Sequence, residues 1–326
     1  MRTIFFKNKP KIIATSSVVG PKESCGSIGK FVDVKLNDDM FGEDTFEKAE
    51  TKILYTAINT AINKLDDKKI DTIISGDLLD QIIASTFAVR NFNVGYLGVY
   101  NACASFAESL SLGATLIDGG YLNKVVCSAS SHFSSAERQY RYPLELGSTR
   151  PPQAQWTVTG AGACVLSSVG EGPNIFCSTI GRIVDYGVID ANNMGAAMAP
   201  AAFDTIYTHL KDIDKPASYY DLIVTGDLGI LGTRIVKDLL WEKGIDIEKQ
   251  HVDCGELIYN ICEQEYQGGS GAGCSAVVFS SYLFSRLRER KLKRILLVAT
   301  GALLSSLSVQ QGESIPGIAH AVGVEC

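Results

Sequence analysis

Two stretches of this sequence repeat one another about half a chain apart. The stretch Asp71-Thr-Ile-Ile-Ser-Gly76-Asp77-Leu78 and the stretch Asp221-Leu-Ile-Val-Thr-Gly226-Asp227-Leu228 share an acidic residue, four mostly β-branched residues and then Gly-Asp-Leu. A short apolar run that ends in a glycine turn is typical of a buried strand. The chain is therefore expected to contain one structural unit twice.

A second repeated pair follows in the same order. Cys103-Ala-Ser, a helix-like stretch and the run 124–130 resemble Cys274-Ser-Ala, a helix-like stretch and the run 294–300. Similarity that recurs in a fixed order indicates an internal duplication. The halves are expected to meet in the glycine-rich stretch at 169–173.

Within each half, strand-like runs alternate with helix-like runs. In the first half we expect strands over 11–19, 71–75, 96–101, 124–130 and 157–167, and helices over 46–65, 81–90 and 103–118. This alternation is the signature of parallel sheets covered by helices. The predicted fold class is α/β, with duplicated halves of βαβαβαββ type over residues 1–170 and 171–326.

The charge balance excludes one class of partner. The formal net charge is −6, whereas nucleic-acid recognition requires a concentrated basic surface. The single dense basic run, Arg286 to Arg294, is interpreted as a solvated helix end rather than a binding patch. We therefore expect no nucleic-acid partner.

Cysteine spacing and hydropathy set further limits. The nine cysteines form no Cys-x-x-Cys pair and their number is odd, which favours reduced thiols without structural zinc. The longest uncharged apolar stretch, 295–307, has about 13 residues, and about 20 are needed to span a bilayer. We expect no metal, no cofactor and no transmembrane segment, so that any membrane association is peripheral or through a partner.

The order of elements resembles that of the thiolase superfamily of acyl-transfer and condensing enzymes. The features that carry the resemblance are the duplicated halves, a cysteine after the third strand of the first half and the late turn Gly301-Ala302. The resemblance covers nearly the whole chain and implies a five-layer αβαβα sandwich and a homodimer. It places Cys103 at the position of the thiolase nucleophile, at a helix start that would favour a thiolate.

Shorter blocks are similar to the stage V sporulation protein AD family of endospore-forming bacteria. These blocks are 76–79, 130–132, 136–139, 141–143, 157–162, 198–202, 299–305 and 313–316. The resemblance implies a sporulation protein that binds dipicolinic acid (pyridine-2,6-dicarboxylate), possibly with calcium, and supports its uptake into the developing spore. It further implies other stage V sporulation membrane proteins as partners and a peripheral place at the spore inner membrane.

Thiolase chemistry needs a basic group beside the cysteine. Condensing enzymes keep a histidine after the second strand of their second half, where this chain has Thr225-Gly-Asp-Leu228. Thiolases keep another in a Gly-His-Pro-x-Gly motif, and the matching segment 267–274 has none. We therefore expect no catalytic residue, with Cys103 in the pocket wall. The alternatives are an acyl-CoA or acyl-carrier condensing enzyme or acyltransferase that uses Cys103, and a scaffold with a vestigial pocket.

The four histidines of the chain lie outside these motifs. His209 is expected at the surface, His251 at a strand edge and His320 in a structural role. His132 follows a first-half strand, so it either reaches the pocket or anchors a loop through a hydrogen bond. Cys274 is expected to be a packed small residue.

A ligand pocket is expected where glycine-rich turns of both halves converge, because exposed N–H groups in such turns attract anions. Arginines in the polar segment 137–156, including Arg150, could pair with carboxylates or could only structure the loop, which is interpreted as a lid or dimer contact. Asp227 would approach the metal of a calcium chelate, although one carboxylate is no calcium site. The residues expected to bind the ligand are Cys103, His132, Asp227, Leu228, Ser270, Gly271, Gly301, Ala302, Arg138 and Arg141.

Overall fold

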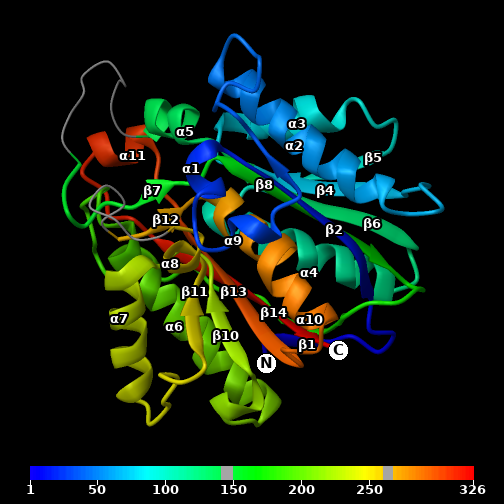
Figure 1. The fold of residues 1–326 in the computed structure, drawn as a ribbon. Helices are drawn as coiled ribbons and strands as arrows, with labels where there is room; N and C mark the ends of the chain where they lie inside the picture. Colours follow the sequence, from blue (N-terminus) through cyan, green and yellow to red (C-terminus); the bar gives the residue numbers. More distant parts are fainter. Residues whose placement is uncertain (141–149, 260–266) are drawn as a thin grey trace.

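A computed structural model describes residues 1–140, 150–259 and 267–326 (Figure 1). The first half contains β1 (Thr3–Phe5), β2 (Lys11–Val19), α1 (Pro21–Ser24), β3 (Val34–Lys35), α2 (Phe46–Asn63), β4 (Thr72–Gly76), α3 (Ile83–Val89), β5 (Gly95–Gly98), α4 (Ser105–Asp118), β6 (Lys124–Ser131), α5 (Phe133–Tyr140), β7 (Trp156–Thr157) and β8 (Gly160–Ser167). The second half contains β9 (Asn174–Thr179), α6 (Met194–Ile213), β10 (Leu222–Thr225), α7 (Gly229–Trp241), β11 (His251–Asp253), α8 (Cys254–Ile258), β12 (Gly269–Ser270), α9 (Ala272–Val278), α10 (Phe284–Arg288), β13 (Arg294–Ala302), α11 (Ser306–Gln310) and β14 (Gly317–Glu325).

The main sheet has the same strand order in each half. From one edge the order is β5-β4-β6-β8-β2, followed by β9-β14-β13-β10-β11. β2 and β9 meet at the centre through one residue pair, Lys11 with Asn174. β8 and β14 run antiparallel to their neighbours, while β4 and β10 each pair in parallel on both sides. The α/β fold is confirmed, with mixed sheets in place of the expected parallel ones. The boundary near residue 170 stays a prediction.

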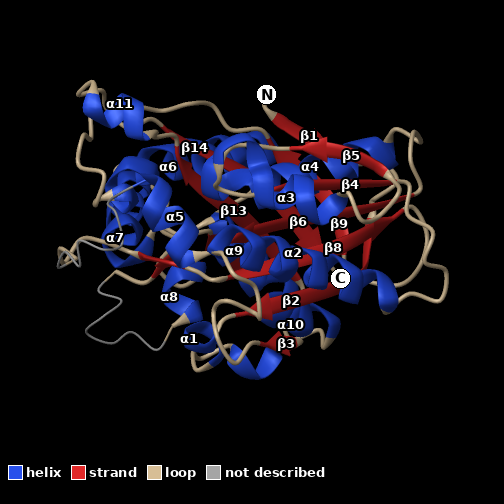
Figure 2. Cartoon of the chain, turned by 90° about the horizontal axis from the view of Figure 1, so that it is seen from above, coloured by secondary structure: helices blue, strands red, loops and turns tan. Residues whose placement is uncertain are grey.

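Helices form three layers around the two halves of this sheet (Figures 1 and 2). α2 covers the outer face of the first-half strands, and α6 covers the outer face of the second-half strands, with α7 beside it. α4 and α9 lie between the two halves. Three clusters of buried apolar residues fill the spaces between these layers. The molecule is therefore the expected five-layer αβαβα sandwich.

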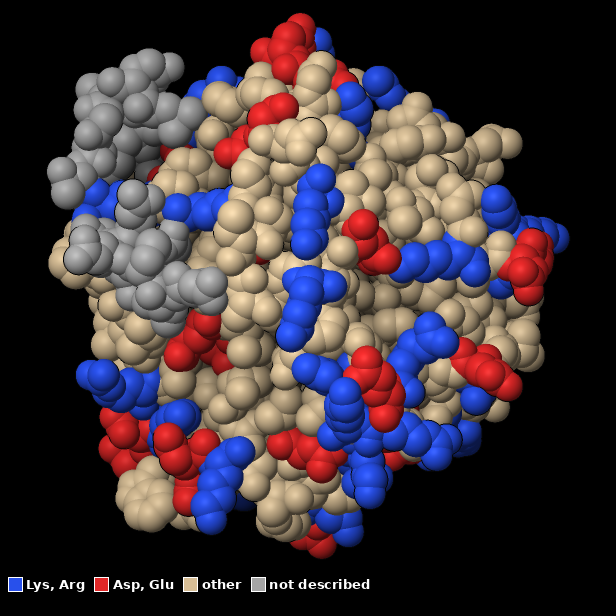
Figure 3. Space-filling view, in the orientation of Figure 1, with Lys and Arg blue, Asp and Glu red and all other residues tan. Residues whose placement is uncertain are grey.

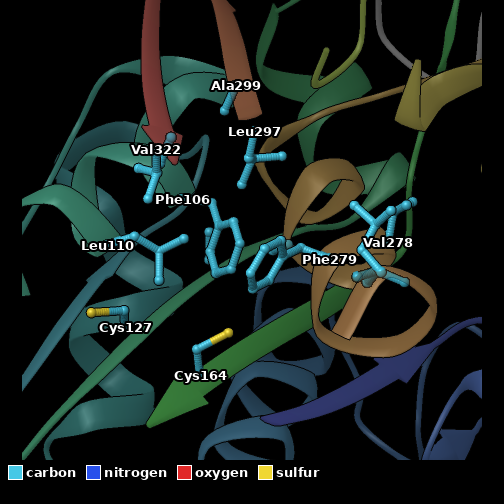
Figure 4. Packing of buried hydrophobic residues seen from close by; sticks show 14 of the residues in the cluster. Phe106, Leu110, Cys127, Cys164, Val278, Phe279, Leu297, Ala299 and Val322 are labelled. Atoms are coloured by element: carbon cyan, nitrogen blue, oxygen red, sulfur yellow. The ribbon is translucent and has the colours of Figure 1, made fainter. Parts of the chain in front are cut away.

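The central layer is closed by two aromatic rings. Phe106 of α4 and Phe279, in the π-helical turn after α9, have their ring centroids 5.8 Å apart. Figure 4 shows Leu297 and Val322 on one side of these rings and Cys164 on the other. Both phenylalanines are fully buried. The two halves thus share one core.

The sequence predicts second-half strands near 175–184, 221–225, 250–254 and 295–300, and this prediction missed β14. Its residues, GIAHAVGVE, are mostly small, and they lack the strong β-branched run that marked the other strands. β14 is nevertheless buried along almost its whole length because it lies between β13 and β9. Tertiary pairing decides its conformation.

Within the described residues, no helix is long and apolar enough to cross a membrane. Eight cysteines are free thiols, and Cys262 lies outside the described residues. The same part of the chain contains no group of three or more His, Cys, Asp or Glu side chains that could hold a metal ion.

Candidate functional site

A cavity of about 440 Å³ lies between the two halves, beyond the carboxyl ends of β4 and β13. Open α/β sheets bind ligands at this edge. Four of the ten expected residues lie in the described wall: Cys103, Ser270, Gly271 and Ala302. The others lie behind the wall, elsewhere in the fold or outside the described residues.

Cys103 lies in a tight turn that joins β5 to α4. A 3₁₀ turn, Ala102–Ala104, precedes α4, so the thiol stands just before the α-helix rather than at its first residue. Ala102 has φ +49°, a left-handed conformation that strains a residue with a Cβ. Gly301 packs against this turn, since a Cβ there would lie 2.5 Å from the Asn101 carbonyl oxygen. Gly301 thus supports the wall from behind.

Asp227 is the polar partner of the thiol. It is 1% exposed, and its carboxylate accepts hydrogen bonds from the Thr300 hydroxyl at 2.6 Å and from the Gly271 N–H at 3.0 Å. A side-chain hydrogen bond also joins it to Cys103. Burial raises the pKa of Asp227 to about 6, against the lowering effect of these hydrogen bonds. At neutral pH the thiol therefore faces a carboxylate, and two negative charges in contact repel each other.

The backbone N–H groups expected to bind an anion already have carboxylate partners. Asp253 accepts hydrogen bonds from the N–H groups of Leu228 at 2.9 Å and Gly229 at 3.0 Å. Asp227 accepts a hydrogen bond from the N–H of Gly271. Leu228 is buried behind the wall. These three N–H groups are therefore not available to a ligand's carboxylates, because the chain's own carboxylates accept their hydrogen bonds.

The arginines expected at the ligand do not line the described wall. Arg138 forms an ion pair with Glu47 and is half-exposed, and Arg141 lies outside the described residues. The charged side chains in the described wall are Asp80 and Glu137. Glu137 is paired with Arg150 at 3.1 Å, which stands behind it. The wall that the structure describes thus contains two carboxylates and no lysine or arginine.

His132 does not reach the cavity. Side chains alternate along a strand, and Ser131 points toward α9, where its hydroxyl oxygen accepts a hydrogen bond from the N–H of Gly273. The next side chain therefore points to the other face, where the His132 ring contacts Phe46 and its Nε2 lies 2.8 Å from the Asp39 carbonyl oxygen. The loop-anchoring alternative is the one realised.

The other histidines also lie away from the cavity wall. His209 is fully buried between the hydroxyls of Thr179 and Tyr220, each 2.6 Å from a ring nitrogen, so its expected surface position is wrong. His251 lies on the edge strand β11, as expected. His320 accepts a hydrogen bond from the Gly181 N–H at 3.2 Å and is structural.

Sequence reasoning did not identify several residues of the cavity wall. Tyr100 and Tyr140 form an aromatic side of the cavity, with their hydroxyl oxygens 2.8 Å apart. Tyr140 also donates a hydrogen bond to the Leu78 carbonyl oxygen. The only signal for Tyr140 was its place within the polar segment 137–156, in which sequence reasoning considered the arginines instead.

One wall residue has hydrogen-bonding capacity to spare. Ser270 is 1% exposed, and its hydroxyl has no hydrogen-bond partner among the described residues. A buried polar group without a partner is costly. A ligand in the cavity could supply the missing partner, while Cys103 and Thr157 offer further polar contacts nearby.

Comparison with known proteins identifies relatives of two kinds. The family model for stage V sporulation protein AD matches residues 1–325. Stage V sporulation protein AD of Bacillus subtilis (strain 168) is 41% identical over 326 residues, covering 99% of this chain and 96% of that protein.

Solved structures of condensing enzymes share the fold. The 3-oxoacyl-[acyl-carrier-protein] synthase III of Aquifex aeolicus VF5 aligns with a TM-score of 0.57 at 15% identity, over 97% of this chain and 100% of that one. Cerulenin-bound OleA of Xanthomonas campestris aligns with a TM-score of 0.60 at 15% identity, over 99% and 100%. Identity this low shows the fold alone. The chain belongs to the stage V sporulation protein AD family and has a thiolase-like fold.

Proposed function

We propose that this protein binds dipicolinic acid, as its calcium chelate, in the cavity between its halves and supports its uptake into the developing spore without catalysing a reaction. The observation that carries the proposal is the hydrogen bond between Cys103 and the Asp227 carboxylate, inside a cavity whose described wall contains no histidine. A thiolate nucleophile needs a neighbouring base or positive charge. The Asp227 carboxylate accepts a hydrogen bond from the thiol, and its negative charge disfavours the thiolate, so the pair suits binding better than covalent catalysis.

The wall chemistry favours the chelate over the free dianion. The free dianion would face two carboxylates, Asp80 and Glu137, in the cavity wall. The part of the wall that the structure describes contains no lysine or arginine to offset them. The one-to-one calcium chelate is neutral, and the metal prefers oxygen ligands. Tyr100 and Tyr140 offer aromatic surface to a flat pyridine ring. The calcium would arrive with its ligand.

Calorimetry of the full chain with dipicolinic acid, with and without calcium, tests this proposal. Saturable heat is expected with the chelate and weaker heat with the free acid. The absence of saturable heat with both forms would contradict the binding proposal and favour the scaffold alternative.

The alternative is a condensing enzyme or acyltransferase that uses Cys103. This alternative is considered because solved structures with the same fold are condensing enzymes. Mass spectrometry after incubation with acyl-CoA separates the two functions. We expect no stable acyl adduct. An adduct that forms on the natural chain and disappears in Cys103→Ser would support the enzyme.

We further propose a homodimer that works peripherally at the spore inner membrane with other stage V sporulation membrane proteins. β5 pairs only with β4 among the described strands, so its outer N–H and C=O groups are open to another chain. Exposed apolar side chains surround this edge, namely Ile83, Phe87, Leu97 and Tyr100. A second copy could extend the sheet across a twofold axis.

A further inference from the structure

Basic side chains of both halves gather around the end of α10. Arg288 and Arg290 line a hollow of about 470 Å³ together with Lys11, at the start of β2, and the loop 170–173. Arg288 also lines a neighbouring hollow that contains Lys64 and Phe31. The run that looked like an isolated helix end in the sequence thus belongs to a surface assembled from distant segments.

We name this surface the basic face. Its members are Lys11, Lys30, Lys64, Arg286, Arg288, Arg290 and Lys291, with the acidic residues Asp33, Glu171 and Glu289. Seven basic and three acidic side chains give it a net charge of +4, in a chain whose net charge is −6. Figure 3 shows blue side chains crowding the lower right of the view, where Figure 1 places α10. The chain's positive charge is therefore unevenly distributed.

Part of this charge is free to bind another molecule. Arg286 and Lys291 share Glu289, at 3.3 and 2.8 Å. Lys11, Arg288 and Arg290 form no ion pair with any residue that the structure describes. These three side chains line one hollow, so they can contact the same anionic surface.

An exposed apolar side chain directly precedes the loop that lines the same hollow. Val169, next to Gly170, is 71% exposed. Unpaired cations around an apolar tip suit the interface of an anionic bilayer, which attracts each basic residue and accommodates the tip. An acidic protein surface would match the charge but would leave the tip unexplained.

We infer that the basic face is the surface by which this protein docks on an anionic phospholipid bilayer. The face lies at the strand edge opposite the cavity, because Lys11 begins β2 and Arg290 precedes β13, whereas the cavity lies beyond the end of β13. Figure 1 shows α10 at the far end of the molecule from α5 and α11. A docked molecule therefore keeps its cavity open to the aqueous side.

This inference rests on the peripheral membrane location proposed above, but its test needs no dipicolinic acid. The full chain is sedimented with vesicles of phosphatidylcholine alone or with about 30% phosphatidylglycerol, in about 0.1 M and about 1 M salt. Binding is expected only to the anionic vesicles and only at low salt, because salt shortens the screening length from about 10 Å to about 3 Å.

Paired variants locate the surface. In Arg288→Gln/Arg290→Gln the vesicle affinity is expected to fall roughly tenfold or more, since each basic residue near an anionic bilayer contributes on the order of a fivefold change. The control Lys35→Gln/Arg234→Gln removes the same charge from exposed residues of β3 and α7 and is expected to bind like the natural chain. Melting temperatures verify that both variants fold.

Three results would overturn the inference: no binding to anionic vesicles, equal binding to neutral vesicles, or equal losses in both variants. Calorimetry with the calcium chelate is run in parallel on the Arg288→Gln/Arg290→Gln protein. Unchanged ligand affinity is expected, because the cavity lies at the opposite edge. A failure of ligand binding in the natural chain would count against the proposed function while leaving the vesicle result intact.

Discussion

The reactivity of Cys103 depends on the group that accepts a hydrogen bond from its thiol. The site contains a thiol and a strained turn at the position expected for a nucleophile, but the Asp227 carboxylate lies beside the thiol. The same carboxylate also takes the N–H of Gly271 and the hydroxyl of Thr300. Asp227 thus accepts hydrogen bonds from the thiol, the N–H and the hydroxyl, and these donors are no longer available to an anionic ligand.

Removing that charge is expected to make the thiol more reactive. In Asp227→Asn, alkylation of Cys103 by iodoacetamide at pH 8 should accelerate, on the order of tenfold for each pKa unit of lost repulsion. The rate is measured by mass spectrometry, with the exposed Cys25 as an internal reference for the reagent. An unchanged or slower alkylation rate at Cys103 would show that the Asp227 carboxylate does not stabilise the protonated form of the thiol.

Ser270 is expected to contribute to ligand affinity. Its hydroxyl is buried, unpaired among the described residues and in the cavity wall. Ser270→Ala should weaken binding of the calcium chelate roughly fivefold, which corresponds to one hydrogen bond of about 1 kcal/mol.

Ser275 provides the matched control for this measurement. Its hydroxyl is also buried without a described partner, but it lies on α9 outside the wall. Ser275→Ala should leave the affinity measured by calorimetry unchanged. Equal affinities in the two variants would remove Ser270 from the ligand's contacts.

Among the elements, α4 and the α9–α10 helix link the halves of the molecule. Both pack between the two halves of the sheet and meet through the rings of Phe106 and Phe279. The outer helix α2 packs on strands of the first half, whereas α6 packs on strands of the second half and on β1. The central pair is therefore where the two halves become one cooperative unit.

Truncation in this layer is expected to destabilise the whole chain. Phe279→Ala should lower the free energy of unfolding by about 3–5 kcal/mol, because a fully buried ring leaves a cavity. Urea unfolding followed by circular dichroism measures the change. Tyr186→Ala, at a side chain that is 63% exposed, should cost at most about 0.5 kcal/mol. Separate transitions for the two halves would contradict a shared core.

At the scale of the whole molecule, buried ionisable groups set the pH dependence of stability. Burial raises the pKa of Glu23 and of Asp253 to about 7, so the folded state holds their protons longer than the unfolded state does. Their contribution to stability is therefore lost progressively as pH rises from about 4.5 to about 7. Burial lowers the pKa of His209 and His320 to about 4, and that contribution is lost as pH falls below about 6.5.

The contribution of the buried acids is therefore expected to fall mainly between pH 5 and pH 7, and above about pH 6.5 the histidines no longer oppose the resulting fall in melting temperature. In Glu23→Gln this fall should be smaller, and the variant should exceed the natural chain at pH 8 by up to about 3 kcal/mol in the free energy of unfolding. At pH 5 the two should be nearly equal. The exposed Glu248→Gln should follow the natural profile, and a parallel shift of Glu23→Gln at every pH would contradict the assignment.

The proposed dimer is also a property of the whole molecule. Leu97→Lys places a charge on the exposed edge of β5, where Leu97 is 45% exposed. It should shift sedimentation from dimer to monomer, because a buried, unpaired ammonium opposes the interface. Trp241→Lys, an equally drastic change on exposed α7, should not alter the oligomeric state. A monomeric natural chain would contradict the dimer.

Much of this protein was determined by the sequence alone. The repeated Gly-Asp-Leu turns and the repeated cysteines predicted the duplication, and the two Gly-Asp-Leu turns follow equivalent strands, β4 and β10. Local patterns also predicted most strands and helices, together with the position of Cys103 in a cavity wall. These features follow from chain-local chemistry, in which hydrophobic period and turn residues act within a few positions.

Tertiary structure alone decided what the cavity offers a ligand. The sequence predicted free N–H groups at Leu228 and Gly271, but Asp253 and Asp227 fold back onto them. It treated the basic run before β13 as an isolated helix end, but Lys11 joins it from the first half. Which partner satisfies a polar group depends on residues far along the chain, and only folding brings them within hydrogen-bond distance.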